Sequence, residues 1–452
     1  MTAVVKKRIL AAVAALMMAM LLCGCDGGLE LVFNPQELYS LPELPAKYTE
    51  LNQQINAILE GGAEYASPTS GTNIQPVQLA DLDGDGREEA VAFFRKADDE
   101  KPLKIYIFST MGGDSYEQSA VIEGSGTSIY SVVYSDLDND GRAELIVGWK
   151  VSTELQALSV YTLRESEPKE LLRSISYVKY AIADMNEDQL QELVILRADE
   201  EGDGLADYYS WRDDKLVLQS SARISMSMAE LSQQGRLTSG ILEGEVSALF
   251  VTGVTEQSSA VTDVLAVRNG DLNNIVLSEV TGVSGEIWPF YGLYPTDING
   301  DGLTEIPCPV RLDEEGPFQR VDWRYFGLDG SSSIVVSTYH NMEDSWYLNL
   351  PESWVGTVCA EKTASSGENS ITFYMLDDGE LGNAVLRIST ITGAGREVKA
   401  TRGNRFLLSR QKTSIYTAEL PETGTGWPHA MSADEVREAF KLIAPEWTTG
   451  DN

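Results

Sequence analysis

The chain has 452 residues, of which 43% are hydrophobic, and its formal net charge at pH 7 is −35. This hydrophobic content is sufficient for folded cores and argues against a wholly disordered chain. The strong negative charge argues against nucleic acid as a partner, because phosphate groups bind to basic surfaces. The acidic residues either form a solvated surface or hold cations, and their arrangement along the chain must decide between the two.

Residues 1–24 have the features of a bacterial lipoprotein signal peptide. A basic segment at 6–8 precedes an apolar, uncharged run at 9–22. This run is short for a bilayer-spanning helix, which favours a signal peptide over a membrane anchor. Residues 22–25, Leu-Cys-Gly-Cys, resemble the lipobox, and this resemblance implies lipidation at Cys25. We therefore expect a mature chain anchored to the membrane outside the cytoplasm; an ordinary signal peptide with a chance cysteine is the alternative.

Two other cysteines, Cys308 and Cys359, remain in the expected mature chain. In an exported protein they could form one disulfide. They could equally be separate buried apolar residues, which we favour. The sequence has no CxxC pair or His/Cys cluster, so it gives no support to a structural zinc site.

Residues 25–60 are predicted to form an extended tether followed by a short helix. Three prolines between residues 35 and 45 disfavour regular structure in the tether. Apolar residues then recur at helical spacing over 48–59, which predicts the helix.

The centre of the chain contains a repeat. Four similar Asp-rich segments begin at Asp81, Asp136, Asp184 and Asp297, with separations of 55, 48 and 113 residues. The last gap is about twice the others and contains a degenerate copy at 240–251, which keeps the apolar pattern but lacks the aspartates. Five units of roughly 50 residues are typical of propellers or solenoids.

Each unit has the pattern of four β-strands, two of which flank the Asp-rich segment. In the first unit these two are residues 77–80 and 90–94, which are apolar or alternating. Four strands are the content of one propeller blade. We therefore predict an all-β propeller over residues 70–342. Five visible repeats make five blades the simplest closure, while six or seven are possible if flanking strands contribute.

Residues 343–452 lack Asp-rich segments and are predicted to form a separate, small α+β domain. Strand-like runs occur at 346–354, 370–375 and 384–389. Ser432 and Glu435 form a capping box that predicts a helix as far as Ile443. The order of these elements loosely resembles that of Mog1/PsbP-like domains.

The Asp-rich segments have the ligand pattern of a calcium loop. Calcium prefers six to eight oxygen ligands, and the loops offer acids at positions 1, 3, 5 and 9, a glycine at position 6 and a carbonyl at position 7. The expected ligands are Asp81, Asp83, Asp85, the Arg87 carbonyl and Glu89 in the first loop; Asp136, Asp138, Asp140, the Arg142 carbonyl and Glu144 in the second; and Asp297, Asn299, Asp301, the Leu303 carbonyl and Glu305 in the last. A weaker set comprises Asp184, Asn186, Asp188, the Leu190 carbonyl and Glu192, because Gln189 replaces the glycine there.

Position 12 distinguishes these loops from EF-hands, which need a bidentate acid there. Ala92, Val147 and Cys308 occupy that position here. An acid at position 9 within a β-repeat instead resembles the FG-GAP/VCBS repeats of integrin α-chain propellers and bacterial surface proteins. This resemblance covers about 260 residues and implies a propeller with about three structural Ca²⁺ sites. The alternative is that the loops are Asp/Gly-rich turns capped by their own side chains.

The sequence has no recognisable catalytic motif of hydrolases, zinc proteases or nucleotide-binding enzymes. Its two histidines, His340 and His429, are expected in surface or turn positions. We predict a non-enzymatic, lipid-anchored, calcium-stabilised propeller that binds an extracellular protein or glycan. A carbohydrate-active enzyme on the same scaffold is one alternative, and an envelope assembly component that presents the C-terminal domain is another. Aromatic residues that could contact a ligand are Trp149, Trp211, Trp288 and Tyr291.

Overall fold

The computed structural model describes residues 46–443, except for 111–114, 165–166, 313–317, 378–379 and 425. The predicted signal peptide, Cys25 and most of the predicted tether therefore lie outside the described residues. Among the described helices, none is long and apolar enough to cross a membrane.

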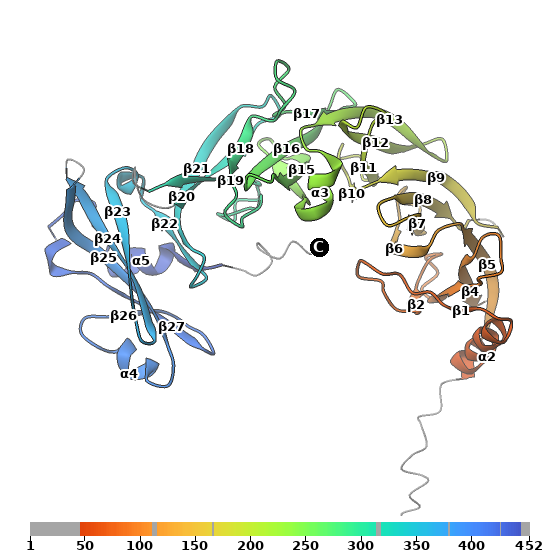
Figure 1. Ribbon diagram of the computed structural model, residues 1–452, viewed down its shortest axis with the longest axis horizontal. Coiled ribbons are helices and arrows are strands. Elements are labelled where there is room, and N and C mark those ends of the chain that lie inside the picture. The colour runs from red at the N-terminus through yellow and green to blue at the C-terminus, as the bar shows by residue number, and fades with distance from the viewer. Residues whose placement is uncertain are drawn as a thin grey trace, which may run out of the picture.

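Six antiparallel sheets follow one another along the chain (Figure 1). The first five each contain four consecutive strands, as the repeat predicts. They consist of β2 (Val77–Ala80), β3 (Glu89–Arg95), β4 (Leu103–Thr110) and β5 (Tyr116–Gly124); β6 (Ser128–Ser135), β7 (Glu144–Lys150), β8 (Gln156–Thr162) and β9 (Lys169–Tyr177); β10 (Lys179–Ala183), β11 (Glu192–Ala198), β12 (Gly204–Arg212) and β13 (Lys215–Ile224); β14 (Arg236–Leu242), β15 (Val246–Val254), β16 (Ser259–Arg268) and β17 (Asp271–Asn274); and β19 (Ile306–Arg311), β20 (Phe318–Phe326), β21 (Ser332–Asn341) and β22 (Trp346–Leu350).

Three further strands extend these sheets at their sides. The short β1 (Glu64–Tyr65) pairs with β3, and β18 (Glu286–Pro289) pairs with β16. The third additional strand, β28 (Phe440–Leu442), joins the edge of the fifth sheet by pairing with β22.

The sixth sheet consists of β23 (Val358–Ser365), β24 (Glu368–Asp377), β25 (Glu380–Thr392), β27 (Ser414–Glu419) and β26 (Phe406–Arg410).

Neighbouring sheets pack face to face, because the second strand of each unit is apolar on both sides. In β7, Leu145 and Val147 pack toward the first sheet, whereas Ile146 between them packs toward the third. The same alternation occurs in β11 between the second and fourth sheets, and in β3 between the second sheet and helix α2 (Ala46–Glu60). Successive residues of one strand therefore belong to two different cores.

The described sheets form an open arc rather than a closed ring (Figure 1). Both end faces of the row are already covered. Helix α2 (Ala46–Glu60), which was predicted, packs Leu51 and Ile55 against the outer face of the first sheet. At the other end, the sixth sheet shares a core with Tyr339 and Trp346 of the fifth sheet. Closure of five blades, the simplest prediction, is therefore not seen among the described residues, where α2 and the sixth sheet cover the two end faces.

The C-terminal region differs from the prediction at two points. Strand β22 pairs with β21, so the boundary expected after residue 342 falls within the fifth sheet. The capping box at Ser432 is present, but its helix α5 (Ala433–Ala439) ends earlier than expected. The next three residues form β28, because the open edge of β22 offers hydrogen-bond partners to their backbone. The remaining helices are short: α3 (Met228–Gln234), which the sequence analysis missed, α4 (Arg396–Ala400), η2 (Glu352–Trp354) and η3 (Glu422–Gly424).

The structure places the two cysteines as we favoured from the sequence, but it places one of the two histidines differently. Cys308 and Cys359 are buried and form no disulfide among the described residues, so they pack as small side chains in separate cores. The surface position expected for His340 is wrong. Its ring is fully buried and stacks on Tyr347, with ring centroids 5.1 Å apart. Neither ring nitrogen has a hydrogen-bond partner within the described residues. Burial lowers the pKa of His340 to about 3. His429 is exposed.

Candidate metal sites in the Asp-rich loops

Each Asp-rich loop precedes the second strand of its sheet. The position-9 glutamates Glu89, Glu144 and Glu192 are the first residues of β3, β7 and β11, and Glu305 directly precedes β19. This placement holds the glutamate in the sheet while the aspartates remain in the exposed loop. In the fourth sheet, a tight turn at 243–245 replaces the loop, which agrees with the predicted degenerate copy.

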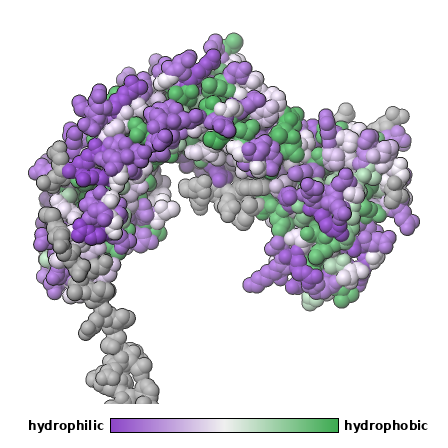
Figure 2. All heavy atoms as spheres, turned by 180° about the vertical axis from the view of Figure 1, so that it is seen from behind, coloured by the Kyte–Doolittle hydropathy of each residue, from purple (hydrophilic) through white to green (hydrophobic). Residues whose placement is uncertain are grey.

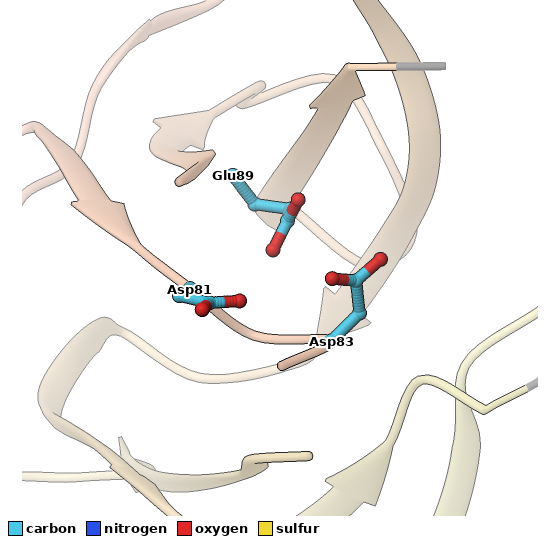
Figure 3. A group of neighbouring side chains, drawn as sticks. All are labelled: Asp81, Asp83 and Glu89. Carbon is cyan, nitrogen blue, oxygen red and sulfur yellow. The ribbon is translucent and has the colours of Figure 1, made fainter. Parts of the chain in front are cut away.

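Three carboxylates of the first loop converge on one point (Figure 3). Oxygen atoms of Asp81, Asp83 and Glu89 lie within 4.8 Å of one another, a spacing that could hold a metal ion. Asp81 shapes the loop by accepting hydrogen bonds from the backbone N–H groups of Gly84 and Gly86, each at 2.9 Å. The position-5 carboxylate of Asp85 is outside this group and pairs with Arg87 of its own loop.

The second loop repeats this arrangement with a more buried glutamate. Oxygen atoms of Asp136, Asp138 and Glu144 also lie within 4.8 Å of one another. Glu144 is fully buried, and its Oε2 accepts the Leu137 N–H at 3.1 Å. Burial raises the pKa of Glu144 to about 7. Its Oε1 and the Oδ1 of Asp138 are buried and have no hydrogen-bond partner among the described residues. Because buried polar atoms are rarely left unpaired, these oxygens fit a site for a cation.

The third loop pairs its glutamate differently, while Oδ1 of Asp184 is buried without a hydrogen-bond partner among the described residues. The Asn186 side-chain amide donates to Glu192 Oε1 at 2.9 Å, so the oxygen that is unpaired in Glu144 has a partner here. Gln189 occupies the glycine position with a positive φ of 71°. Asp184 and Asp188 accept backbone hydrogen bonds within the loop. In this loop, which the sequence predicted to be the weaker metal site, an amide of the loop itself therefore donates a hydrogen bond to the glutamate.

The last loop leaves its glutamate unpaired again. Glu305 is fully buried, and its Oε2 accepts the Ile298 N–H at 3.1 Å. Its Oε1 has no hydrogen-bond partner in the part of the chain that the structure describes. Burial raises the pKa of Glu305 to about 7, and repulsion from Asp301 and Asp297 adds to the effect. Asn299 donates to Asp301 at 2.8 Å, and the carboxylates of this loop are not grouped as closely as those of the first two.

The backbone at position 7 follows one pattern in all four loops. Its N–H group donates to the position-5 side chain at 2.8–2.9 Å. The donors are Arg87, Arg142, Leu190 and Leu303, and the acceptors are Asp85, Asp140, Asp188 and Asp301. This bond holds the turn that precedes the position-9 glutamate.

The loops also connect neighbouring sheets, which the sequence analysis missed. The position-2 carbonyl accepts a hydrogen bond from the position-8 N–H of the next loop: Ala143 donates to Leu82, and Gln191 donates to Leu137, both at 2.9 Å. Thr304 donates in the same way, at 2.9 Å, to Ile241 of the degenerate unit. In each of the four Asp-rich loops the position-2 N–H also donates to the position-9 glutamate. The position-2 residue therefore belongs both to the candidate metal site and to the junction between sheets. Its signal in the sequence was that position 2 is apolar in every copy.

A second missed residue is Arg164, whose guanidinium group reaches the second loop from the connection between β8 and β9. It lies 20 residues after Glu144, and no local motif indicates this contact.

Residues 81–147, which include the first two loops, match the FG-GAP-like repeat. The chain contains an FG-GAP-like repeat. No protein with a curated description matches the sequence. Among solved structures, a Lactobacillus plantarum protein is 9% identical with a TM-score of 0.28, over 74% of this chain and 96% of the other. A Xanthomonas type IV secretion system related protein is 11% identical with a TM-score of 0.22, over 46% of this chain and 96% of the other. The FG-GAP-like repeat thus coincides with the two loops whose acids are most closely grouped.

Proposed function

We propose that this protein is an extracytoplasmic lipoprotein, anchored through Cys25, whose calcium-stabilised β-sheet scaffold binds a protein or glycan. The observation that carries the calcium proposal is the pair of buried glutamate oxygens, in Glu144 and Glu305, that have no hydrogen-bond partner beside loop aspartates. Hard oxygen ligands from a flexible loop are the donor set that Ca²⁺ prefers. The acidic surface is consistent with this setting, and Figure 2 shows hydrophilic side chains over much of the outer rim of the arc.

Calcium would act here as a structural ion. The aspartates and the position-9 glutamate of each loop would hold it, and it would neutralise their mutual repulsion. A ligand present at ten times its dissociation constant stabilises a fold by roughly 1.4 kcal/mol per site. Three sites would together contribute about 4 kcal/mol, a large part of an ordinary domain stability of about 5–15 kcal/mol. The ions would also hold the junctions between sheets, because position 2 links each glutamate to the next loop.

A groove of about 1070 Å³ between β5 and the β8–β9 region is our candidate for the partner-binding surface. Trp149 and Tyr161 line it together with the more exposed Leu155, Glu170 and Arg173. Trp149 and Tyr161 are buried and form the floor, so the accessible surface comes mainly from Leu155 and from polar groups. An apolar side chain beside charged and hydroxyl groups suits a glycan or an extended peptide. Trp149 was one of the aromatic residues considered from the sequence.

Calcium titration followed by thermal unfolding tests the scaffold. We expect the melting temperature of the mature protein to rise with Ca²⁺ and to fall after chelation. An unchanged melting temperature after chelation would contradict a structural role for the loops.

A glycan array and co-purification from cell envelopes test the partner, with L155E in the groove and L218E as a matched control. These leucines are 43% and 45% exposed, and Leu218 lies outside the groove. Binding that L155E abolishes and L218E preserves would support the groove. Hydrolysis of a bound glycan would instead support the carbohydrate-active alternative.

A further inference from the structure

Arg164 contacts the second Asp-rich loop at the place where a cation is expected. Its Nη2 forms ion pairs with Asp138 and Asp140, the latter at 3.0 Å, and lies 3.9 Å from Oε1 of Glu144. That oxygen is the buried atom without a hydrogen-bond partner. One guanidinium group therefore faces three carboxylates that the sequence assigned to a metal ion.

The same side chain also reaches the third sheet. Its Nη1 lies 3.7 Å from Oδ1 of Asp214, and its guanidinium carbon lies 5.1 Å from the ring centroid of Trp211. Trp211 is in β12, and Asp214 lies in the turn between β12 and β13. Arg164 thus has a second set of partners, an exposed carboxylate and an aromatic face, on the neighbouring sheet.

Among the described residues, the other loops lack such a cation. There, Arg87 pairs only with Asp85 of its own loop, and no basic side chain forms an ion pair with the acids of the last loop. In the third loop the Asn186 amide occupies the glutamate oxygen. The second loop therefore differs from its relatives through one residue that comes from outside the repeat motif.

We propose that Arg164 is a built-in competitor of the metal ion in the second loop. Without a divalent cation, Arg164 neutralises Asp138, Asp140 and Glu144. When a divalent cation binds, Arg164 leaves these carboxylates and retains Asp214 and Trp211 as its partners. The second loop consequently binds calcium more weakly than its acids alone would allow, and its occupancy changes the contact between the second and third sheets. This inference rests on the calcium binding proposed above.

Calorimetric titration of the full mature chain with Ca²⁺ tests the proposal through R164Q and R268Q. Arg268 is the matched control: it is exposed, ends β16 of the fourth sheet, which lacks an Asp-rich loop, and forms no ion pair within the described part of the chain. We expect R164Q to gain at least tenfold in affinity at one site, and R268Q to change by less than threefold. The gain should vanish in the double variant R164Q/D136N, which assigns it to the second loop.

Thermal unfolding provides a readout independent of binding. R164Q should melt at a lower temperature than the wild type in chelator, and calcium should restore it. Equal destabilisation with and without calcium, or an unchanged affinity in R164Q while the wild type binds calcium, would overturn the inference. A wild type that binds no calcium would instead overturn the proposed function. If R164Q does not fold in either buffer, R164K is measured in its place, because an ammonium group cannot bridge three carboxylates as a guanidinium does. A higher calcium affinity of R164K than of the wild type supports the proposal, and an equal affinity overturns it.

Discussion

Replacing Glu305 by glutamine should have opposite effects on stability with and without calcium. Glu305 is fully buried, one of its oxygens accepts the Ile298 N–H, and the other has no partner. No basic side chain pairs with this loop among the residues that the structure describes, so nothing but a bound cation would offset the buried charge. Glutamine keeps the shape and can still accept the Ile298 hydrogen bond.

The size of the effect follows from two independent quantities. In metal-free protein, burial raises the pKa of Glu305 from 4.5 to about 7. The charged form therefore destabilises the fold above pH 7 by about 3 kcal/mol, and E305Q should recover up to that amount in chelator. At a calcium concentration 100 times the dissociation constant, the site contributes about 2.7 kcal/mol. E305Q should lose most of this contribution.

Urea unfolding at pH 8, followed by tryptophan fluorescence in calcium and in chelator, measures both effects. E279Q is the control, because Glu279 is exposed and its replacement changes the net charge equally. The advantage of E305Q in chelator should shrink as the pH falls from 7 toward 4.5, since the native carboxyl then becomes protonated. If E305Q is equally destabilising in calcium and in chelator, Glu305 is only a hydrogen-bond acceptor and the reasoning is refuted.

Three further predictions concern other parts of the molecule. Burial lowers the pKa of His340 to about 3. Below pH 6.5 this histidine is therefore protonated in the unfolded chain but neutral in the folded chain. The free energy of unfolding should consequently fall by up to about 1.4 kcal/mol per pH unit between pH 6.5 and 3. H340F should lessen this slope in urea unfolding at several pH values, and an unaltered slope would disprove it. G84A should destabilise the fold by ~1 kcal/mol or more relative to G86A. Both glycines have a positive φ, but only a Cβ at Gly84 would meet the Gly141 carbonyl oxygen, at 2.0 Å. Equal melting temperatures of the two variants would exclude this contact between loops. N186D should remove the amide donor to Glu192 and restore an acidic ligand, so calorimetry should detect one additional calcium site; no additional site would contradict the role assigned to Asn186.

Much of the local structure was predictable from the sequence, because its signals are carried by residues close together in the chain. Alternating and continuous apolar runs predicted the strands around each loop, such as β2 and β3 around Asp81. The repeat spacing located the degenerate fourth unit. The seven-residue helix α3, which has its own capping box, was missed in the connection that precedes this unit. The convergence of Asp81, Asp83 and Glu89 also follows from local spacing, since loop and strand start belong to one short segment.

The sequence by itself determined the strand content, the number of units and the acids available at each loop. Only the tertiary structure decided whether the row of sheets closes, because α2 and the sixth sheet cover its ends through contacts between distant segments. It also decided the surroundings of each buried glutamate oxygen among the described residues: Oε1 of Glu192 accepts the Asn186 amide, Oε1 of Glu144 lies 3.9 Å from Arg164, and Oε1 of Glu305 has no hydrogen-bond partner. Strand periodicity reports which face of a sheet is buried, but the partner of each buried charge depends on how neighbouring sheets stack.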